Sequence, residues 1–269
     1  MGKGLKTALI ALGVGAWIIA PGMVSRDKTQ VFEGLNVAHR GLHTKDKSIP
    51  ENSLPAFDAA CENGYGIELD VQLSKDGEVV VFHDDTLNRV CGVDSRVDGK
   101  TLEELKALSL CGTKETIPLF SEVLDVVKGR APLIVELKKS PKTEELCKKT
   151  LALLRAYDGP FCIESFDPRI VTWFRFNAPD IVRGQLACKR ADYGKGVSPV
   201  MAYILEHCLL NFAARPHFIA YDLVELPLTV KLMHKMGAMR VCWTSHEEGN
   251  EVNQDTVIFE FYHPATHFL

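Results

Sequence analysis

The most informative stretch of the chain is IELDVQLSKDG, residues 67–77, which leads into VVVFHDDTL, residues 79–87. Hydrophobic residues alternate with Glu68 and Asp70 in its first half, so on a β-strand both carboxylates point to the same face. Two carboxylates on one face repel each other unless a cation lies between them. The stretch therefore predicts a buried strand that carries a metal-binding pair of acids.

Two histidines end strand-like runs in the same part of the chain. His39 follows NVA, residues 36–38, and His83 follows VVVF, residues 79–82. A lone histidine is more often a structural hydrogen-bonding group, but imidazole also titrates near neutral pH and transfers protons. Because both histidines end strands beside the acids, the sequence predicts two proton carriers flanking a metal site.

Strand-like and helix-like segments alternate about eight times along the chain. The strand-like runs are 36–39, 66–71, 79–83, 132–137, 161–165, 182–187, 218–222, 239–243 and 256–261. The helical candidates are 52–63, with Asn52 as its cap, 101–108, with a capping box, 143–157, 168–176, 200–212 and 228–236. The repeat predicts an α/β fold with a parallel sheet covered by helices, in the form of a (β/α)8 TIM-type barrel. An open doubly wound sheet is the alternative, but no Gly-x-Gly-x-x-Gly follows the first strand.

A third carboxylate completes the predicted metal site. Glu136 follows LIV, residues 133–135, on the next parallel strand, and Lys138 comes two residues later. In such barrels the active site forms at the carboxyl ends of the strands, where these residues, Glu68, Asp70 and both histidines are all expected. Three carboxylates suit a hard cation, so the expected cofactor is one Mg²⁺ or Ca²⁺ ion.

The ordered motifs resemble those of the glycerophosphodiester phosphodiesterase family. The matching motifs are HRG (39–41), PENS (50–53), ELDV (68–71), HDDTL (83–87), IPLFSEVL (117–124), VELK (135–138), SFD (165–167) and WT (243–244). The resemblance covers about residues 35–265. It implies that His39 and His83 are the catalytic pair and that Glu68, Asp70 and Glu136 bind the metal.

The resemblance also suggests residues that contact the substrate. Arg40 and Lys138 match positions that contact phosphate, although either could be an ordinary ion-pair partner of the acids. Glu51 is either a pocket residue or an acid at a helix start. Trp243 is either a pocket residue or part of the barrel core.

The implied reaction is hydrolysis of a glycerophosphodiester to sn-glycerol 3-phosphate and an alcohol such as choline, ethanolamine or glycerol. The attacking group is either water or the substrate's own 2-hydroxyl, which would give a cyclic phosphate first. Two alternatives remain open: a lysophospholipase D-like enzyme that acts on membrane lysolipids, and a non-catalytic barrel that binds anionic phosphorylated ligands.

The N-terminus contains a charge-free, mostly apolar run from Thr7 to Ser25. Its length is close to the ~20 residues that a helix needs to span a bilayer. We therefore expect residues 1–30 to be a hydrophobic membrane anchor with a linker, and residues 31–269 to be the barrel domain. A cleaved signal peptide and a core helix are the alternatives. Basic residues flank both ends, so the side of the membrane is not determined.

Composition limits the remaining partners. The net charge is −4 and no long basic block is present, so nucleic-acid binding has no electrostatic support. The 8 cysteines include no Cys-x-x-Cys pair, which argues against a zinc site. The expected partners are a small phosphodiester or lysophospholipid and, through the N-terminus, a membrane.

Overall fold

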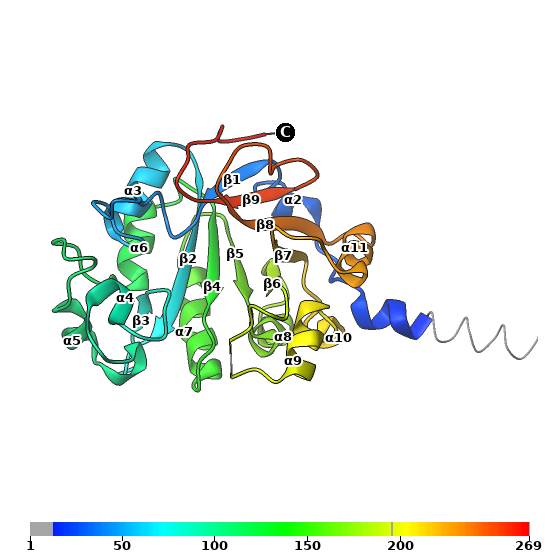
Figure 1. Cartoon of the computed structure of the whole chain (residues 1–269), viewed down its shortest axis with the longest axis horizontal. Helices are drawn as coiled ribbons and strands as arrows, with labels where there is room; N and C mark the ends of the chain where they lie inside the picture. Colours follow the sequence, from blue (N-terminus) through cyan, green and yellow to red (C-terminus); the bar gives the residue numbers. More distant parts are fainter. Residues whose placement is uncertain (1–12, 195, 269) are drawn as a thin grey trace, which may run out of the picture.

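The structure, a computed structural model, describes residues 13–194 and 196–268. Eight parallel strands form the wall of a barrel, and helices surround it (Figure 1). The strands are β1 (Leu35–Ala38), β2 (Gly66–Leu73), β4 (Leu133–Leu137), β5 (Phe161–Ser165), β6 (Arg183–Ala187), β7 (Phe218–Asp222), β8 (Met239–Ser245) and β9 (Thr256–Phe259). They pair in the order β1-β9-β8-β7-β6-β5-β4-β2, and β1 pairs with β2 through Val37 and Gly66. This last pairing closes the barrel, so the predicted TIM-type fold is confirmed.

The helices lie mostly between consecutive strands. They are α2 (Arg26–Thr29), α3 (Leu54–Glu62), α4 (Asn88–Cys91), the 3₁₀ turn η1 (Val97–Gly99), α5 (Leu102–Lys106), α6 (Phe120–Val127), α7 (Thr143–Arg155), α8 (Pro168–Asn177), α9 (Pro199–Glu206), α10 (Asn211–Ala214) and α11 (Leu228–Lys235). The predicted helix 200–212 is two helices, because Cys208 takes a positive φ of 49° between them. Helix α6 was not predicted as a helix.

Capping residues explain two of the helix starts. Thr101 accepts a hydrogen bond from the Glu104 amide, and Glu104 accepts one from the Thr101 amide, so the predicted capping box of α5 is present. The cap of α3 is Ser53, which accepts from the Ala56 amide. Asn52, the predicted cap, instead has a φ of 53° and donates to Asp70. Asn52 therefore supports Asp70 in the site and does not cap α3.

Strand β3 (Val79–Val81) departs from the predicted repeat. It runs antiparallel to the last part of β2, with Val71 opposite Val81 and Leu73 opposite Val79. It does not belong to the barrel wall, and it brings the chain back toward the strand ends, where the Phe82 amide donates to the Asp70 carbonyl at 3.0 Å. His83 thus reaches the site from a return strand and not, as predicted, from the end of a barrel strand.

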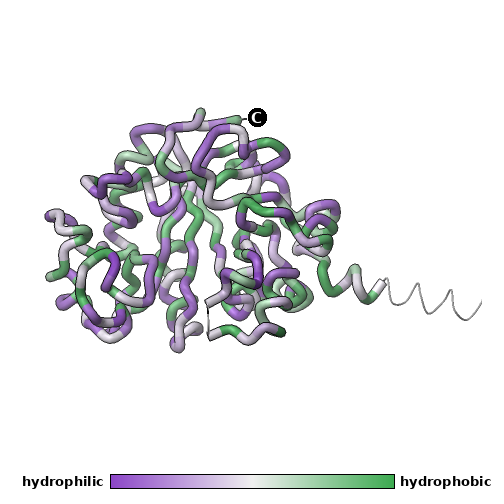
Figure 2. The backbone as a smooth tube through the Cα atoms, in the orientation of Figure 1, coloured by the Kyte–Doolittle hydropathy of each residue, from purple (hydrophilic) through white to green (hydrophobic). Residues whose placement is uncertain are grey.

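Hydrophobic side chains fill the barrel and the space between its wall and the helices. Val37, Ile134, Cys162, Phe218 and Val241 belong to the interior cluster. Residues of alternate parity on the same strands face outward against α3, α6, α7 and α8. Figure 2 shows hydrophobic colour along the central strands. The metal-site acids Asp70 and Glu136 lie toward the carboxyl ends of their strands, where active sites of such barrels form.

The structure contradicts the predicted membrane anchor. Residues 13–19 are helical, but the helix stops there, and residues 20–25 are not helical. The Trp17 ring stacks on Phe212 with 5.9 Å between centroids, and Arg215 donates to the Trp17 and Ala20 carbonyls. Within residues 13–194 and 196–268, no helix is long and apolar enough to cross a membrane.

In its described part, residues 13–25, the apolar run is helical over 13–19 and irregular after that, and the helical part packs on the domain. Ile19 is buried against Val230 and Met233 of α11. The first residues of the predicted anchor, 1–12, lie outside the described part of the chain. The division of the chain at residue 30 stays a prediction.

Candidate active site

The three predicted metal ligands lie together inside the barrel. Parallel register places Asp70 of β2 beside Glu136 of β4, while Glu68 lies two residues earlier on β2, beside Ile134. One carboxylate oxygen from each of Glu68, Asp70 and Glu136 lies within 4.8 Å of the others. All three residues are buried. A buried group of three carboxylates is costly without compensating positive charge.

Two cationic side chains and two amide groups supply part of that compensation. Lys138 Nζ lies 2.9 Å from Glu136 Oε1 and 3.2 Å from Asp70 Oδ1. Arg40 Nε lies 3.7 Å from Asp70 Oδ2, and the Arg40 amide donates to Glu68 at 3.0 Å. Asn52 Nδ2 donates to Asp70 Oδ2 at 2.8 Å. Of the three carboxylates, Asp70 thus has the most ion-pair and hydrogen-bond partners.

The pKa values of the three acids follow from these contacts. Burial raises the pKa of Glu68 well above its ordinary value, and the neighbouring Asp70 raises it further. Burial also raises the pKa of Glu136, which Lys138 offsets only in part. Burial would raise the pKa of Asp70 as well, but Lys138, His83 and Arg40 together hold it below its usual range. The site therefore needs further positive charge before all three acids ionise, and oxygen ligands of this kind fit Mg²⁺ or Ca²⁺.

His39 follows β1 and faces the carboxylates. Its Nε2 lies 4.0 Å from Glu68 Oε2, and its Nδ1 lies 3.6 Å from Glu260 Oε1. Glu260 also pairs with His43 Nε2 at 2.9 Å. Burial lowers the pKa of His39 to about 4, so the imidazole is neutral at physiological pH and free to accept a proton.

His83 belongs to a network that runs back to Arg40. His83 Nδ1 lies 2.6 Å from Asp84 Oδ1, and Arg89 Nε donates to Asp84 Oδ2 at 2.7 Å. Arg89 also donates to both oxygens of Glu51, at 2.6 and 2.7 Å, and Arg40 donates to Glu51 at 2.8 Å. The carboxylate of Asp84 holds the His83 ring on one side and leaves Nε2 for a ligand.

Glu51 is therefore held by arginines close to the site. Burial would raise its pKa, but Arg89 and Arg40 outweigh burial and lower the pKa to about 2. Because Ser53 caps α3, Glu51 lies before the helix and does not complement its first turn. The placement favours the pocket interpretation over the helix-start interpretation.

Trp243 lies toward the carboxyl end of β8. Its ring packs edge-on against Phe166, with 5.5 Å between centroids and 89° between planes. It is partly buried against the interior cluster. Trp243 thus packs on the core close to the carboxyl ends of the strands. Both the pocket and the core interpretation of this residue stay predictions.

Several residues of the site were not identified from the sequence. They are Asn52, Asp84, Arg89, Glu164 and Glu260. Glu164 is buried on β5 beside Glu136, and Glu260 follows the hydrophobic run of β9. The signal that identified Glu136, an acid after a buried apolar run, also applies to both of these. Arg89 carried no such signal, because it reaches the site from α4.

Comparison with known proteins adds an independent finding. The model of the glycerophosphoryl diester phosphodiesterase family matches residues 39–261. This range includes every site residue named above.

Individual relatives agree with the family match. A glycerophosphodiester phosphodiesterase of Caldanaerobacter subterraneus subsp. tengcongensis is 42% identical over 113 residues, which are 39% of this chain and 45% of that protein. A glycerophosphodiester phosphodiesterase of Bacillus altitudinis is 40% identical over 127 residues, 42% of this chain and 51% of that protein. The matches thus span about half the length of these curated relatives.

A solved structure is similar over most of the chain. It is a phosphodiesterase of Oleispira antarctica in complex with the product sn-glycerol 3-phosphate. Its TM-score is 0.71 at 25% identity, over 87% of this chain and 95% of that one.

Proposed function

The chain belongs to the glycerophosphoryl diester phosphodiesterase family, and from this premise we propose that it hydrolyses glycerophosphodiesters to sn-glycerol 3-phosphate and an alcohol. The observation that carries the proposal is the buried group of Glu68, Asp70 and Glu136, flanked by His39 and His83. Family membership alone does not require these five residues to converge, so their convergence is separate support.

The three carboxylates would hold one divalent cation, Mg²⁺ or Ca²⁺. When bound, such an ion polarises a phosphoryl oxygen and offsets the negative charge that develops at phosphorus. Lys138 and Arg40 would contact the remaining phosphate oxygens, because both already lie against the carboxylates and carry fixed positive charge. Trp243 would form part of the pocket wall.

His39 and His83 would transfer the protons. His39 would act as the base. Burial keeps its imidazole neutral, and the Glu260 carboxylate would stabilise the positive charge that develops when the ring takes up a proton. His83 would act as the acid, because Asp84 Oδ1 lies 2.6 Å from Nδ1 and holds the ring, which leaves Nε2 for the departing alcohol. Deprotonation of the attacking hydroxyl by one ring and protonation of the departing alcohol by the other completes the hydrolysis.

The experiment is release of sn-glycerol 3-phosphate from glycerophosphocholine by the purified protein. Glu136→Gln keeps the side-chain size and removes a ligand charge, so turnover should fall at least ~100-fold. Glu103→Gln is the matched control, because Glu103 is an exposed glutamate of α5. Equal turnover in both variants, or binding of glycerophosphocholine without any product, would reject the proposal in favour of another site or a non-catalytic barrel.

A second substrate separates the two chemical routes. A diester of 1,3-propanediol has no 2-hydroxyl and cannot form the five-membered cyclic phosphate, so its hydrolysis without any cyclic product would indicate that water is the attacking group. A cyclic phosphate released from the glycerol diester, with no reaction of the propanediol diester, would assign the intramolecular route.

A further inference from the structure

Two of the 8 cysteines lie beside each other in space although they are distant in the chain. Cys91 is the last residue of α4, and Cys111 lies in the turn that follows α5. The Cys111 amide donates to the carbonyl of Val90, the residue before Cys91, at 2.7 Å. Because peptide dimensions are fixed, this hydrogen bond keeps the two Cα atoms within the ~7 Å that a disulfide can bridge. Both thiols are free, and both side chains pack on the same hydrophobic cluster.

The two thiols differ in how readily they ionise. Burial, and then the neighbouring Cys111 thiol, raises the pKa of Cys91 to about 11. Burial also raises the pKa of Cys111, but Lys47 offsets part of that rise. Both cysteines are partly exposed, so a small oxidant can reach them, whereas the cysteines of strands β5 and β8 are buried. Cys111 is therefore the thiol that reacts first, and Cys91 is the thiol beside it.

The backbone at Cys111 is unusual for a cysteine. Cys111 and Gly112 both have a positive φ, 52° and 74°, and the Thr113 amide donates to the Leu110 carbonyl at 3.0 Å. These features define a type I′ turn, where asparagine or aspartate normally precedes the glycine, because other side chains are strained at positive φ. A cysteine thus occupies a position that backbone preference disfavours, which supports a role for its thiol.

The cysteine pair adjoins the network that holds His83. Arg89 lies two residues before Cys91 and donates to both carboxylate oxygens of Glu51 and to both of Asp84. Cys111 also lies close enough to Glu51 and Arg89 for their charges to act on its thiol. The short helix that carries Cys91 therefore also carries the arginine that connects two acids of the site.

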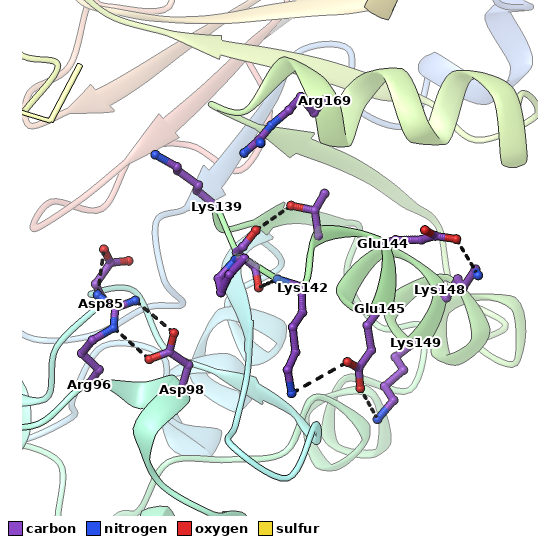
Figure 3. A pocket seen from close by; sticks show the side chains of 13 residues that line it. Asp85, Arg96, Asp98, Lys139, Lys142, Glu144, Glu145, Lys148, Lys149 and Arg169 are labelled. Carbon is purple, nitrogen blue, oxygen red and sulfur yellow. Dashed lines mark hydrogen bonds and ion pairs between the residues drawn. The ribbon is translucent and has the colours of Figure 1, made fainter. Parts of the chain in front are cut away.

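The segment between the two cysteines forms one wall of a polar hollow. The hollow has a volume of about 1300 Å³, and in Figure 3 Arg96 and Asp98 lie on one side of it, opposite the side chains of α7. Arg96 pairs with Asp98 at 2.8 Å and with Asp85 at 3.7 Å. Exposed ion pairs contribute little to stability, so a covalent bond between the ends of this segment would hold the wall more firmly.

We propose that Cys91 and Cys111 form a disulfide when the protein meets a small disulfide oxidant, and that this bond links the end of α4 to the turn at Cys111. With glutathione disulfide, the Cys111 thiolate attacks one sulfur of the oxidant, which gives a mixed disulfide and one glutathione. The Cys91 thiolate then attacks the Cys111 sulfur and releases the second glutathione. Two electrons pass from the cysteines to the oxidant, and their two protons end on the two glutathione thiols.

The bond should stabilise the folded protein. A disulfide across a loop of this length restricts the unfolded chain, so Tm should rise by ~6–12 °C in the oxidised protein. Dithiothreitol should reverse the rise. Because thermal unfolding and mass do not depend on turnover, failure of the proposed function would leave both measurements unchanged.

The test is incubation of the reduced protein with glutathione disulfide at pH 8, alkylation of the remaining thiols and digestion with trypsin without reductant. Trypsin isolates the peptides VCGVDSR (90–96) and ALSLCGTK (107–114). Mass spectrometry should find them as one linked species, lighter by two hydrogens than the two peptides together. Cys91→Ser should abolish both the linked species and the rise in Tm. Cys61→Ser is the matched control and should keep both, since Cys61 is another partly exposed cysteine, on α3.

Three results would overturn the inference. One is recovery of both peptides alkylated or carrying glutathione, with no linked species. Another is a linked species that forms only in a covalent dimer, since the bond would then join two chains. The third is an equal Tm for the oxidised and reduced proteins although the linked species is present, since the bond would then not stabilise the fold. Cys111→Ser should behave as Cys91→Ser, and a rise in Tm that survives in either variant would assign the effect to other thiols and also overturn the inference.

Discussion

Replacing Lys138 by an uncharged residue tests the charge balance of the site. The Lys138 Nζ lies 2.9 Å from Glu136 Oε1 and 3.2 Å from Asp70 Oδ1, and all three groups are largely buried. Lys138→Met keeps the length and removes the charge. Asp70 retains Arg40 and Asn52, so Glu136 is the carboxylate that loses its main partner.

The expected cost follows from the burial of the pair. Removing one partner of a buried ion pair destabilises a protein by ~3–5 kcal/mol, and the partial compensation at Asp70 places this case near ~3 kcal/mol. At ~2–4 °C per kcal/mol for a domain of this size, Tm should fall by ~6–12 °C. A divalent cation should restore more stability in the variant than in the wild type, because it replaces the lost positive charge.

The loss of stability in Lys138→Met should be larger at high pH than at low pH. Without Lys138, the folded-state pKa of Glu136 rises further above its unfolded value of ~4.3. The penalty is then present above that pH and disappears as pH falls below it, because the carboxyl is protonated in both states.

The assay is thermal unfolding of both proteins in EDTA and in excess Ca²⁺, at pH 4 and pH 8. Equal Tm values in EDTA at pH 8 would refute the reasoning, since they would mean that Lys138 does not balance a buried charge. A deficit that is larger at pH 4 would contradict the sign.

Three further predictions address the catalytic pair, the support of Asp70 and acid stability. His39→Ala and His83→Ala should each lower kcat at least ~100-fold with an unchanged circular dichroism spectrum, and near-native kcat would remove that histidine from the mechanism. Asn52→Ala should weaken cation binding ~10–100-fold by calorimetry, because Asp70 loses a hydrogen bond that orients it; unchanged affinity would show that the amide is dispensable. Burial, then Arg183, lowers the pKa of His217 to about 3, so the folded state binds fewer protons than the unfolded state and stability should fall as pH drops below ~6.5. His217→Asn should remove part of this slope in urea unfolding at pH 4–7, and an identical slope would contradict the assignment.

Much of the barrel was predictable because its signals are local. Strands β5 and β7 have the predicted bounds, since each is a short, mostly apolar run of strand length with a proline just before it. The sequence predicted that His83 follows a strand, but it did not show which way this strand runs. Its strand pairs back on β2, and strand direction is a tertiary property that an apolar run does not carry.

The errors share one physical cause. The hydrophobic run before residue 25 has the composition of a membrane helix, but Ile19 is buried against α11 of the same domain. An apolar surface needs a partner, and composition alone does not distinguish lipid from protein. Asn52 was similarly assigned to the nearest helix, because its true partner, Asp70, is distant in sequence.

The most direct test of the central claim is the metal dependence of turnover. The rate of sn-glycerol 3-phosphate release from glycerophosphocholine is measured before dialysis against EDTA, after it, and after Mg²⁺ or Ca²⁺ is added back. Because Glu68, Asp70 and Glu136 are buried with too little positive charge, turnover should disappear in EDTA and return with the cation. Full turnover by the metal-free protein would contradict the account.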